Sequence, residues 1–234
     1  MNIRIKFRKY GSMKFIGHLD IMRYFQKAMR RAEIDICYSE GYSPHQIMSF
    51  AAPLGVGITS DGEYLDIEVH SVSNSKDSIE QLNQVMAEGI EVTEFVKLPE
   101  KAQNAMSIVA AADYTVSFRK GYELDFPWDD DFDSFMKQNS IKILKKTKKS
   151  EKEVDIKPLI YSYQINDDKI NFQLAAGSAN NLKPELIMEA FGNYLNYEFA
   201  AFTFCIHRRE IYANIGEDEK LSLVPLGDLG DNIE

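Results

Sequence analysis

A short segment with the sequence Ser-Glu-Gly-Tyr-Ser-Pro-His, residues 39–45, has the composition of a loop that holds phosphate. Ser39, Ser43 and His45 supply polar side chains, and Gly41 allows backbone angles that let a ligand approach the main chain. The chain has no GxxxxGKS/T pattern of a P-loop, and no GxGxxG follows a predicted strand, so neither route to nucleotide binding is supported. The alternative is a hairpin connection made rigid by proline, without a ligand.

Two histidines are of the type that acts as a general base near neutral pH: His45 in this loop, and His18 before a basic segment. With Tyr42 or a nearby lysine as proton donor or phosphate clamp, either would suit metal-independent cleavage of RNA at the 2′-hydroxyl. A structural hydrogen bond is the commoner role of a single histidine, and this alternative stays open for both. His45, His18 and Tyr42 are therefore the catalytic candidates.

Positive charge is concentrated near the N-terminus of an acidic chain. The protein has 27 basic and 36 acidic residues, a net charge of −9, yet residues 1–31 contain nine Lys or Arg against one acid, Asp20. Helical spacing of about 100° per residue places four of these cations on one face: Arg23, Lys27, Arg30 and Arg31. Such segregation is typical of a surface that meets a polyanion such as RNA, and the alternative is an ordinary solvated face.

The second half of the chain offers two further phosphate candidates. Gly177 and Ser178 follow a predicted strand and precede a helix whose first N–H groups form an anion site, unless Asn180 or Asn181 caps it. The lysine-rich run 145–152 is either a basic turn that contacts phosphate or a solvated hairpin tip. The predicted RNA- or phosphate-binding residues of the whole chain are Arg23, Lys27, Arg30, Arg31, Ser39, Gly41, Ser43, His45, Gly177 and Ser178.

Cysteine usage and hydropathy argue against several classes of protein. Cys37 and Cys205 lie 168 positions apart without a CxxC pattern, which argues against a disulfide framework and against a zinc or iron–sulfur site. We therefore expect no metal and no cofactor. No run of about 18 apolar residues is present to span a bilayer, and basic residues interrupt the N-terminal apolar positions that a signal peptide needs. These observations predict a cytoplasmic protein without a membrane partner.

Hydrophobic periodicity predicts the order β-α-β-β-α-β in the first half. Ile3, Ile5 and Phe7 alternate with basic residues, which indicates a strand with one apolar and one basic face. The other expected elements are a helix at 19–33 with Asp20 as its N-cap, strands at 34–38, 46–51, 63–70 and 90–96, and a helix at 77–88. Asp66 and Glu68 are expected to pair with basic residues of the first strand (Arg4, Lys6 or Arg8), which would neutralise part of the positive patch.

After a linker at 98–107 the pattern is repeated without detectable sequence identity. Its expected elements are strands at 109–118, 141–146, 154–162, 169–175 and 200–212, with helices at 126–138 and 182–195. We therefore predict an α+β protein with two ferredoxin-like (βαββαβ) domains in tandem, each with an antiparallel sheet. The expected boundaries are 1–98, with a glycine-rich middle insertion, 109–214, and a flexible acidic tail at 215–234.

Several motifs in a fixed order resemble those of a bacterial family. They are FIGHLDIMR at 15–23, AMRRA at 28–32, YSEGYSPH at 38–45, PLGVG at 53–57, EYLDIE at 63–68, EVDIKP at 153–158, LAAGS at 174–178 and NLKPE at 181–185. Through them the chain resembles the uncharacterised bacterial radical-SAM-linked proteins over about residues 3–214. In that family the domain occurs as an appendage to a radical SAM enzyme or as a separate protein encoded beside one.

The resemblance implies a separately encoded radical SAM enzyme as partner, because this sequence lacks the CxxxCxxC pattern that holds the cluster of such an enzyme. Members of the family are frequently encoded near ribonuclease and ribosomal-protein genes, which fits a connection with RNA. We therefore expect an RNA-binding accessory protein that serves tRNA or rRNA modification or maturation. The alternatives are a metal-independent endoribonuclease and a protein-docking module without RNA contact.

Overall fold

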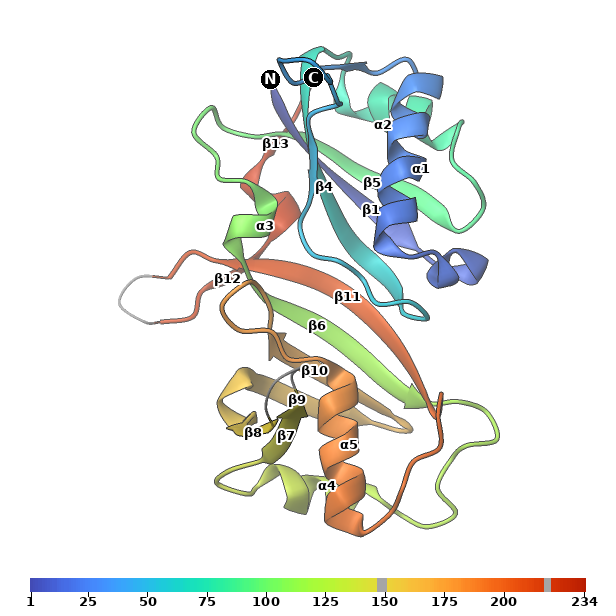
Figure 1. Cartoon of the computed structure of the whole chain (residues 1–234), viewed down its shortest axis with the longest axis vertical. Coiled ribbons are helices and arrows are strands. Elements are labelled where there is room, and N and C mark those ends of the chain that lie inside the picture. Colours follow the sequence, from blue (N-terminus) through green and yellow to red (C-terminus); the bar gives the residue numbers. More distant parts are fainter. Residues whose placement is uncertain (147–150, 217–219) are drawn as a thin grey trace. The chain divides into compact units, whose positions relative to one another are not determined.

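The computed structural model describes residues 1–146, 151–216 and 220–234. These residues form a mixed α+β protein with mostly antiparallel strands and, within the ranges given, five α-helices. The chain divides into two compact units (Figure 1): residues 1–111 together with 208–234, and residues 112–207. Both boundaries fall inside strands, because β6 (Val109–Phe118) and β11 (Phe204–Asn214) each contribute residues to both units.

The sheet of the first unit has β1 (Asn2–Lys9) at its centre. This strand pairs antiparallel with β4 (Thr59–Ser71) on one side and with β5 (Ile90–Lys97) on the other. The order is β13 (Asp231–Asn232), β5, β1, β4 and β11, with β2 (Asp35–Ile36) and β3 (Met48–Phe50) paired to β4 and β12 (Leu223–Pro225) paired to β11. The α-helices of this unit are α1 (His18–Arg31), α2 (Ser75–Asn83) and α3 (Ala105–Ile108).

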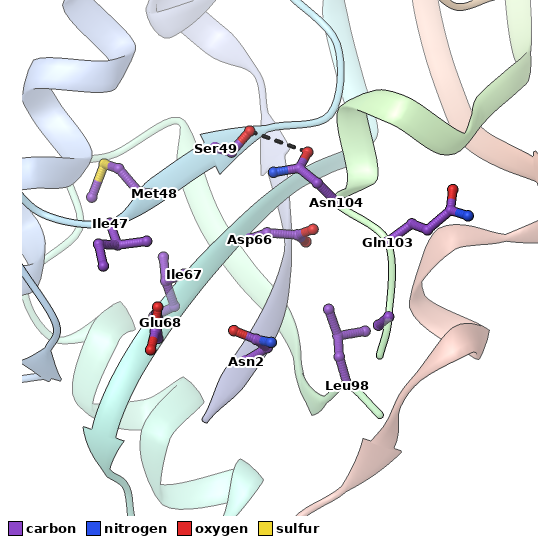
Figure 2. A pocket seen from close by; sticks show the side chains of 11 residues that line it. Asn2, Ile47, Met48, Ser49, Asp66, Ile67, Glu68, Leu98, Gln103 and Asn104 are labelled. Carbon is purple, nitrogen blue, oxygen red and sulfur yellow. Dashed lines mark hydrogen bonds between the residues drawn. The ribbon is translucent and has the colours of Figure 1, made fainter. Parts of the chain in front are cut away.

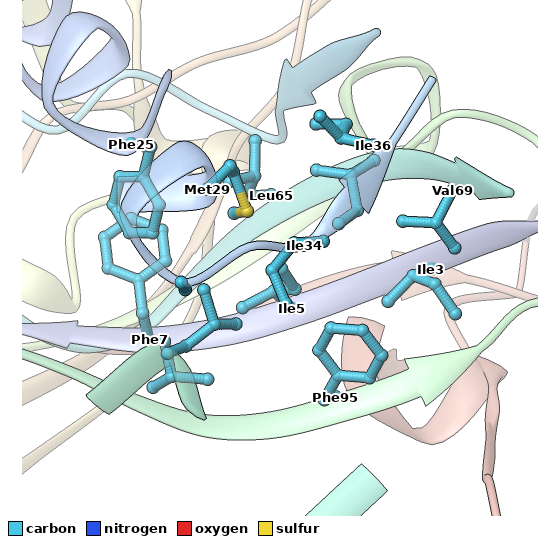
Figure 3. Close-up of a cluster of buried hydrophobic side chains, with 14 of the residues drawn as sticks. Ile3, Ile5, Phe7, Phe25, Met29, Ile34, Ile36, Leu65, Val69 and Phe95 are labelled. Atoms are coloured by element: carbon cyan, nitrogen blue, oxygen red, sulfur yellow. The ribbon is translucent and has the colours of Figure 1, made fainter. Parts of the chain in front are cut away.

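The core of the first unit lies between this sheet and the helices α1 and α2, which lie on the same side of it (Figure 1). Ile3, Ile5 and Phe7 of β1 face this side and are at most 2% exposed. Phe25 of α1 packs on Phe7 with ring centroids 4.7 Å apart, and Figure 3 shows both rings within the apolar cluster. The apolar half of the predicted alternation therefore faces the core. The basic half is left for the opposite face of the sheet.

The second unit has the strand order β11-β6-β10-β9. In it β9 (Ile160–Asn166) and β10 (Lys169–Ala175) form an antiparallel hairpin, and β7 (Lys142–Lys146) pairs with β8 (Glu151–Asp155) in a separate one. Helices α4 (Asp129–Met136) and α5 (Pro184–Leu195) supply an aromatic core. Its closest pair is Phe132 and Phe191, with ring centroids 4.8 Å apart.

Some of the expected elements end elsewhere than predicted. The expected strand at 154–162 is two strands, because β8 ends at Asp155 and a short 3-10 helix, Lys157–Leu159, separates it from β9. Pro158 lies in that 3-10 helix, where its fixed φ and missing N–H oppose a continuous strand. Helix α1 has Gly17 as its N-cap, and Asp20 lies in the first turn, where a carboxylate suits the helix dipole.

Residues 220–234, the described end of the acidic C-terminal segment, do not form the flexible tail expected from its composition. Within residues 220–234, β12 pairs with β11 and β13 pairs antiparallel with β5. Leu226 is fully buried, and its carbonyl accepts a hydrogen bond of 3.1 Å from Arg4. Residues 208–214 also belong to the first unit, although they were expected in the second domain. Two of these partners, β5 and Arg4, lie more than a hundred positions earlier in the chain, so local composition did not indicate them.

Candidate nucleic-acid interface

The basic side chains of β1 make ion pairs and hydrogen bonds with other residues of the protein. Arg4 is 1% exposed and donates hydrogen bonds of 2.7 and 2.9 Å to the two carboxylate oxygens of Asp66. Lys6 pairs with Glu94 at 3.0 Å and with Glu210 at 2.7 Å. Burial lowers the pKa of Lys6, but the hydrogen bonds and charges of Glu210 and Glu94 outweigh burial and raise it overall. The pairing of Arg4 with Asp66 is one of those predicted from the sequence.

The last two basic residues of β1 also have partners within the protein. Arg8 pairs with Asp61 at 2.8 Å and with Glu91 at 3.2 Å. Lys9 is 2% exposed and donates to the carbonyl oxygen of Ile16 at 2.7 Å, and burial lowers the pKa of its ammonium group. The positive excess counted over residues 1–31 is therefore much smaller at the protein surface than the sequence suggests.

Helix α1 carries the cations that stay exposed. Ile21, Phe25 and Met29 of this helix are buried against the sheet, which fixes its rotation about its own axis. At 100° per residue, Arg23 and Arg30 then lie within about 20° of each other, on the side away from the core. Lys27 lies between them along the helix. We call Arg23, Lys27 and Arg30 the α1 basic face.

The side chains of the α1 basic face are available to a ligand. All three residues are exposed. Within the described part of the chain, Lys27 and Arg30 have neither a hydrogen bond nor an ion pair from their side chains. Arg23 contacts Asp20 at 3.4 Å, with the two side chains 69% and 67% exposed. A pair so exposed is screened by water and contributes little, so it does not tie up the arginine.

Arg31, the fourth predicted cation of this helix, is directed elsewhere. Its guanidinium donates to the carbonyl oxygen of Val85 at 3.1 Å and lies 5.9 Å from the ring centre of Tyr24. The Tyr24 hydroxyl in turn accepts a hydrogen bond of 2.6 Å from the amide of Ala87. Arg31 therefore joins α1 to the segment that follows α2.

Residues 39–45 form a closed loop, here called the Ser39–His45 loop. An isolated antiparallel bridge between Tyr38 and Gln46 holds its two ends. Across the neck, the Ser39 amide donates to the His45 carbonyl at 2.8 Å, and the Ser39 hydroxyl lies 2.8 Å from His45 Nδ1. Gly41 has φ of +110°, a conformation that other residues rarely adopt. The glycine is thus required by the turn itself.

One hydrogen bond places the neck of the loop beside α1. Gln46 Nε2 donates to the carbonyl oxygen of Gln26 at 3.2 Å. Gln26 lies three positions after Arg23 and four before Arg30, and residues at these spacings are neighbours on a helix surface. The structure therefore brings the Ser39–His45 loop next to the α1 basic face. Sequence reasoning proposed the two features separately and missed both glutamines, whose amides carry no spacing signal.

The catalytic candidates have different surroundings. His45 is exposed and its ring is oriented by Ser39, whereas Tyr42 at the tip of the loop is fully exposed. His18 is half-buried at the start of α1, with its ring edge-on to Phe50 at 5.4 Å between centroids. His45 and Tyr42 thus share one loop. His18 has a packing role against the core.

The predicted site at Gly177 and Ser178 lies in the second unit. Gly177 has φ of +126° and Ser178 is exposed, in a turn closed by a 3.0 Å bond from the Leu182 amide to the Ala175 carbonyl. The N-cap of α5 is Lys183, without a side-chain cap, so the alternative in which Asn180 or Asn181 caps this helix is wrong. Of the lysine-rich run, residues 147–150 lie outside the described residues.

A small pocket of about 180 Å³ opens in the first unit, on the face of the sheet that carries the β1 ion pairs (Figure 2). Its polar lining includes Asn2, Ser49, Asp66, Glu68, Gln103 and Asn104. The Ser49 hydroxyl donates to Asn104 Oδ1 at 3.3 Å. Asp66 is held by Arg4 and by the amide of Ala105, so its carboxylate is already satisfied. No sequence motif indicated this pocket, because its residues come from four separate segments.

A comparison with models of known protein families identifies the family of this chain. A family model described as "Uncharacterized protein conserved in bacteria (DUF2344)" matches residues 2–184. The chain belongs to this family. The matched range contains the α1 basic face, the Ser39–His45 loop and Gly177 with Ser178.

Comparisons with curated proteins and with solved structures add one distant similarity. A search of curated proteins finds no match. Among solved structures, the chain is similar to one from the "Crystal Structure of a Cbf5-Nop10-Gar1 Complex", with 10% sequence identity and a TM-score of 0.48. The similarity covers 89% of this chain and 48% of that chain.

Among residues 1–146, 151–216 and 220–234, no group of three or more His, Cys, Asp or Glu side chains is arranged to hold a metal ion. In the same ranges no helix has the length and apolar character needed to cross a membrane.

The two cysteines have different surroundings. Burial raises the pKa of the Cys37 thiol, whereas Cys205 is exposed.

Proposed function

We propose that this protein is an RNA-binding accessory protein for a separately encoded radical SAM enzyme, in tRNA or rRNA modification or maturation. The observation that carries the RNA part is the α1 basic face, three exposed cations beside a loop of serine, glycine and histidine. Within the described residues Lys27 and Arg30 make no side-chain hydrogen bond or ion pair, so they can turn toward phosphate without breaking an interaction of the fold, unlike the paired cations of β1.

The chemistry of binding follows from the groups available. Arg23, Lys27 and Arg30 would neutralise phosphates of the RNA backbone and release their counterions. The Ser43 hydroxyl and the main chain around Gly41 would add hydrogen bonds to phosphate oxygens. Such contacts position an RNA without reading its sequence, which is appropriate to a subunit that presents RNA to a separate enzyme.

The fold that we propose for this role is a tandem of two ferredoxin-like domains. In support, the first unit has the order β5-β1-β4 with β2 and β3 beyond β4, and helices follow β1 and β4. The second unit has the order β11-β6-β10-β9, with α4 after β6 and α5 after β10. Both orders are those of a βαββαβ sheet in which the first strand lies between the last and the third.

The partner part of the proposal rests on the motifs that resemble radical-SAM-linked proteins. The two cysteines of this sequence do not supply the three thiolates of a radical SAM cluster, so the cluster would belong to the partner. In this arrangement the present chain binds RNA, and the other polypeptide carries out the radical chemistry.

The experiment measures RNA affinity at 50 and 200 mM salt for the protein alone and with its partner. Three phosphate contacts on a single strand predict binding about twentyfold weaker at the higher salt. The double variant Arg23→Glu/Arg30→Glu is expected to abolish binding. Its matched control is Lys76→Glu/Lys101→Glu, which has the same net charge of −13 and changes two exposed lysines of the same unit. Equal loss in both variants, or no binding by the unmodified protein at low salt, overturns the proposal.

A second candidate function is metal-independent RNA cleavage, favoured by one observation. His45 is exposed with its Nδ1 held by Ser39, which leaves Nε2 as the ring nitrogen that could accept a proton from RNA. Cleavage products that end in a cyclic phosphate, insensitive to chelator and lost in His45→Ala, would establish it. A protein that binds neither intact nor cleaved RNA, yet captures its enzyme after ribonuclease treatment, is a docking module.

A further inference from the structure

The tip of the Ser39–His45 loop carries an aromatic ring, Tyr42, that no described part of the chain covers. Tyr42 is fully exposed, more so than any other large apolar side chain within the described residues. An exposed ring of this size forfeits the burial that usually stabilises a tyrosine. Its position therefore suits a partner that covers the ring.

The neck of the loop is well defined although its tip is exposed. Ser39 and His45 make three contacts of 2.8 to 3.1 Å across the neck, and Pro44 fixes one backbone angle beside them. The bridge between Tyr38 and Gln46 continues this pairing toward the sheet. Tyr42 is thus presented on a short, braced hairpin, so little conformational entropy is lost when a ligand stacks on it.

We propose that this surface takes single-stranded RNA, with an unpaired base stacked on Tyr42 and the flanking phosphates on the α1 basic face. The inference rests on the proposed RNA binding and names its substrate class. Bases in a duplex are stacked on each other and cannot reach a protein ring, whereas an unpaired base can be turned out onto one. Stacking on an aromatic ring next to cations is the general mode by which proteins hold single strands.

The charged and polar side chains around Tyr42 also limit the path that the bound RNA can take. Glu40 is exposed on the first arm of the loop and repels phosphate, while Ser43 and His45 lie on the second arm. The neck on this second arm continues into Gln46, which contacts α1. The phosphate backbone of the RNA is therefore expected to pass along Ser43, His45 and Arg30, on the opposite side of the loop from Glu40.

The test compares one RNA oligonucleotide as a single strand and as a duplex with its complement, using full-length protein. The variants are Tyr42→Ala, Tyr42→Phe and, as matched control, Tyr122→Ala, which removes an exposed tyrosine of the second unit. We expect tighter binding of the single strand, and a loss between about fivefold and a hundredfold in Tyr42→Ala. Tyr42→Phe keeps the ring and is expected to bind as tightly as the unmodified protein.

The outcomes separate this inference from the proposed function. Equal affinity for single strand and duplex, or no effect of Tyr42→Ala, overturns the stacking proposal while RNA binding stands. A loss in Tyr42→Phe as large as in Tyr42→Ala also overturns it, because the hydroxyl would then be the active group. If neither form of RNA binds, the proposed function fails and this inference fails with it.

Discussion

The cations of β1 and those of α1 are neighbours in sequence and have opposite fates in the structure. Arg4, Lys6 and Arg8 lie on a strand between two others, and each meets acids from distant parts of the chain. Arg23 and Arg30 lie on the outer side of a helix, where no element covers them in the described residues. A count of charge along a sequence therefore does not locate a surface. Burial and partners across the sheet decide which cations remain for a ligand.

Among the cations of these two regions, Arg4 should contribute most to the free energy of unfolding. Replacing Arg4 with Met leaves Asp66 with one hydrogen-bond donor in place of three in a nearly closed site, and breaking a buried ion pair costs about 3–5 kcal/mol. We expect the free energy of unfolding, measured by urea denaturation, to fall by this amount. Arg30→Met is the control, expected to change it by less than about 0.5 kcal/mol. Similar losses in both variants would contradict the distinction between the two regions.

A buried tyrosine of β4, Tyr64, predicts a pH dependence of stability. Burial, followed by the charge and hydrogen bond of Glu210, raises the pKa of Tyr64 far above its usual range. The unfolded chain loses this proton near pH 10 and the folded chain keeps it, so stability falls as pH rises above 10. At pH 11 this amounts to about 1.4 kcal/mol. The decline between pH 9 and 11 should be shallower in Tyr64→Phe, and a decline of unchanged slope would count against this assignment.

Arg8 provides an intermediate case on the same strand. Its side chain and those of Asp61 and Glu91 are between 42% and 46% exposed, so water and salt screen the pairs. We expect Arg8→Met to lower the free energy of unfolding by at most about 1 kcal/mol. The loss should shrink further in 0.5 M salt, whereas that of Arg4→Met should persist. A salt-independent loss in Arg8→Met would show that exposure does not govern these pairs.

Local patterns in the sequence predicted most of the elements. The alternation at Ile3, Ile5 and Phe7 indicated β1 and the face that it buries. The apolar stripe at Ile21 and Phe25 indicated α1 within two residues of its observed ends. These patterns suffice because the periodicity of a strand or helix is set by its own residues.

Features that depend on distant residues were not predictable in the same way. Asp66 was expected as a partner of β1, but Glu94 and Glu210 were not, since they lie 88 and 204 positions from Lys6. The hydrogen bond from Arg4 to the carbonyl oxygen of Leu226 was missed for the same reason. At the candidate site, the loop and the helix were each indicated, but the bond from Gln46 to Gln26 that joins them was visible only in the structure.

The central claim is that the α1 basic face, and not the positive segment as a whole, contacts RNA phosphate. The most direct test is the slope of log Kd against log salt concentration for a single-stranded RNA, measured with unmodified protein, Arg30→Gln and Lys76→Gln. Three contacts predict a slope with magnitude of about 2, and loss of one contact should reduce it by about 0.7 in Arg30→Gln alone. An unchanged slope in Arg30→Gln, or an equal reduction in Lys76→Gln, would contradict the claim.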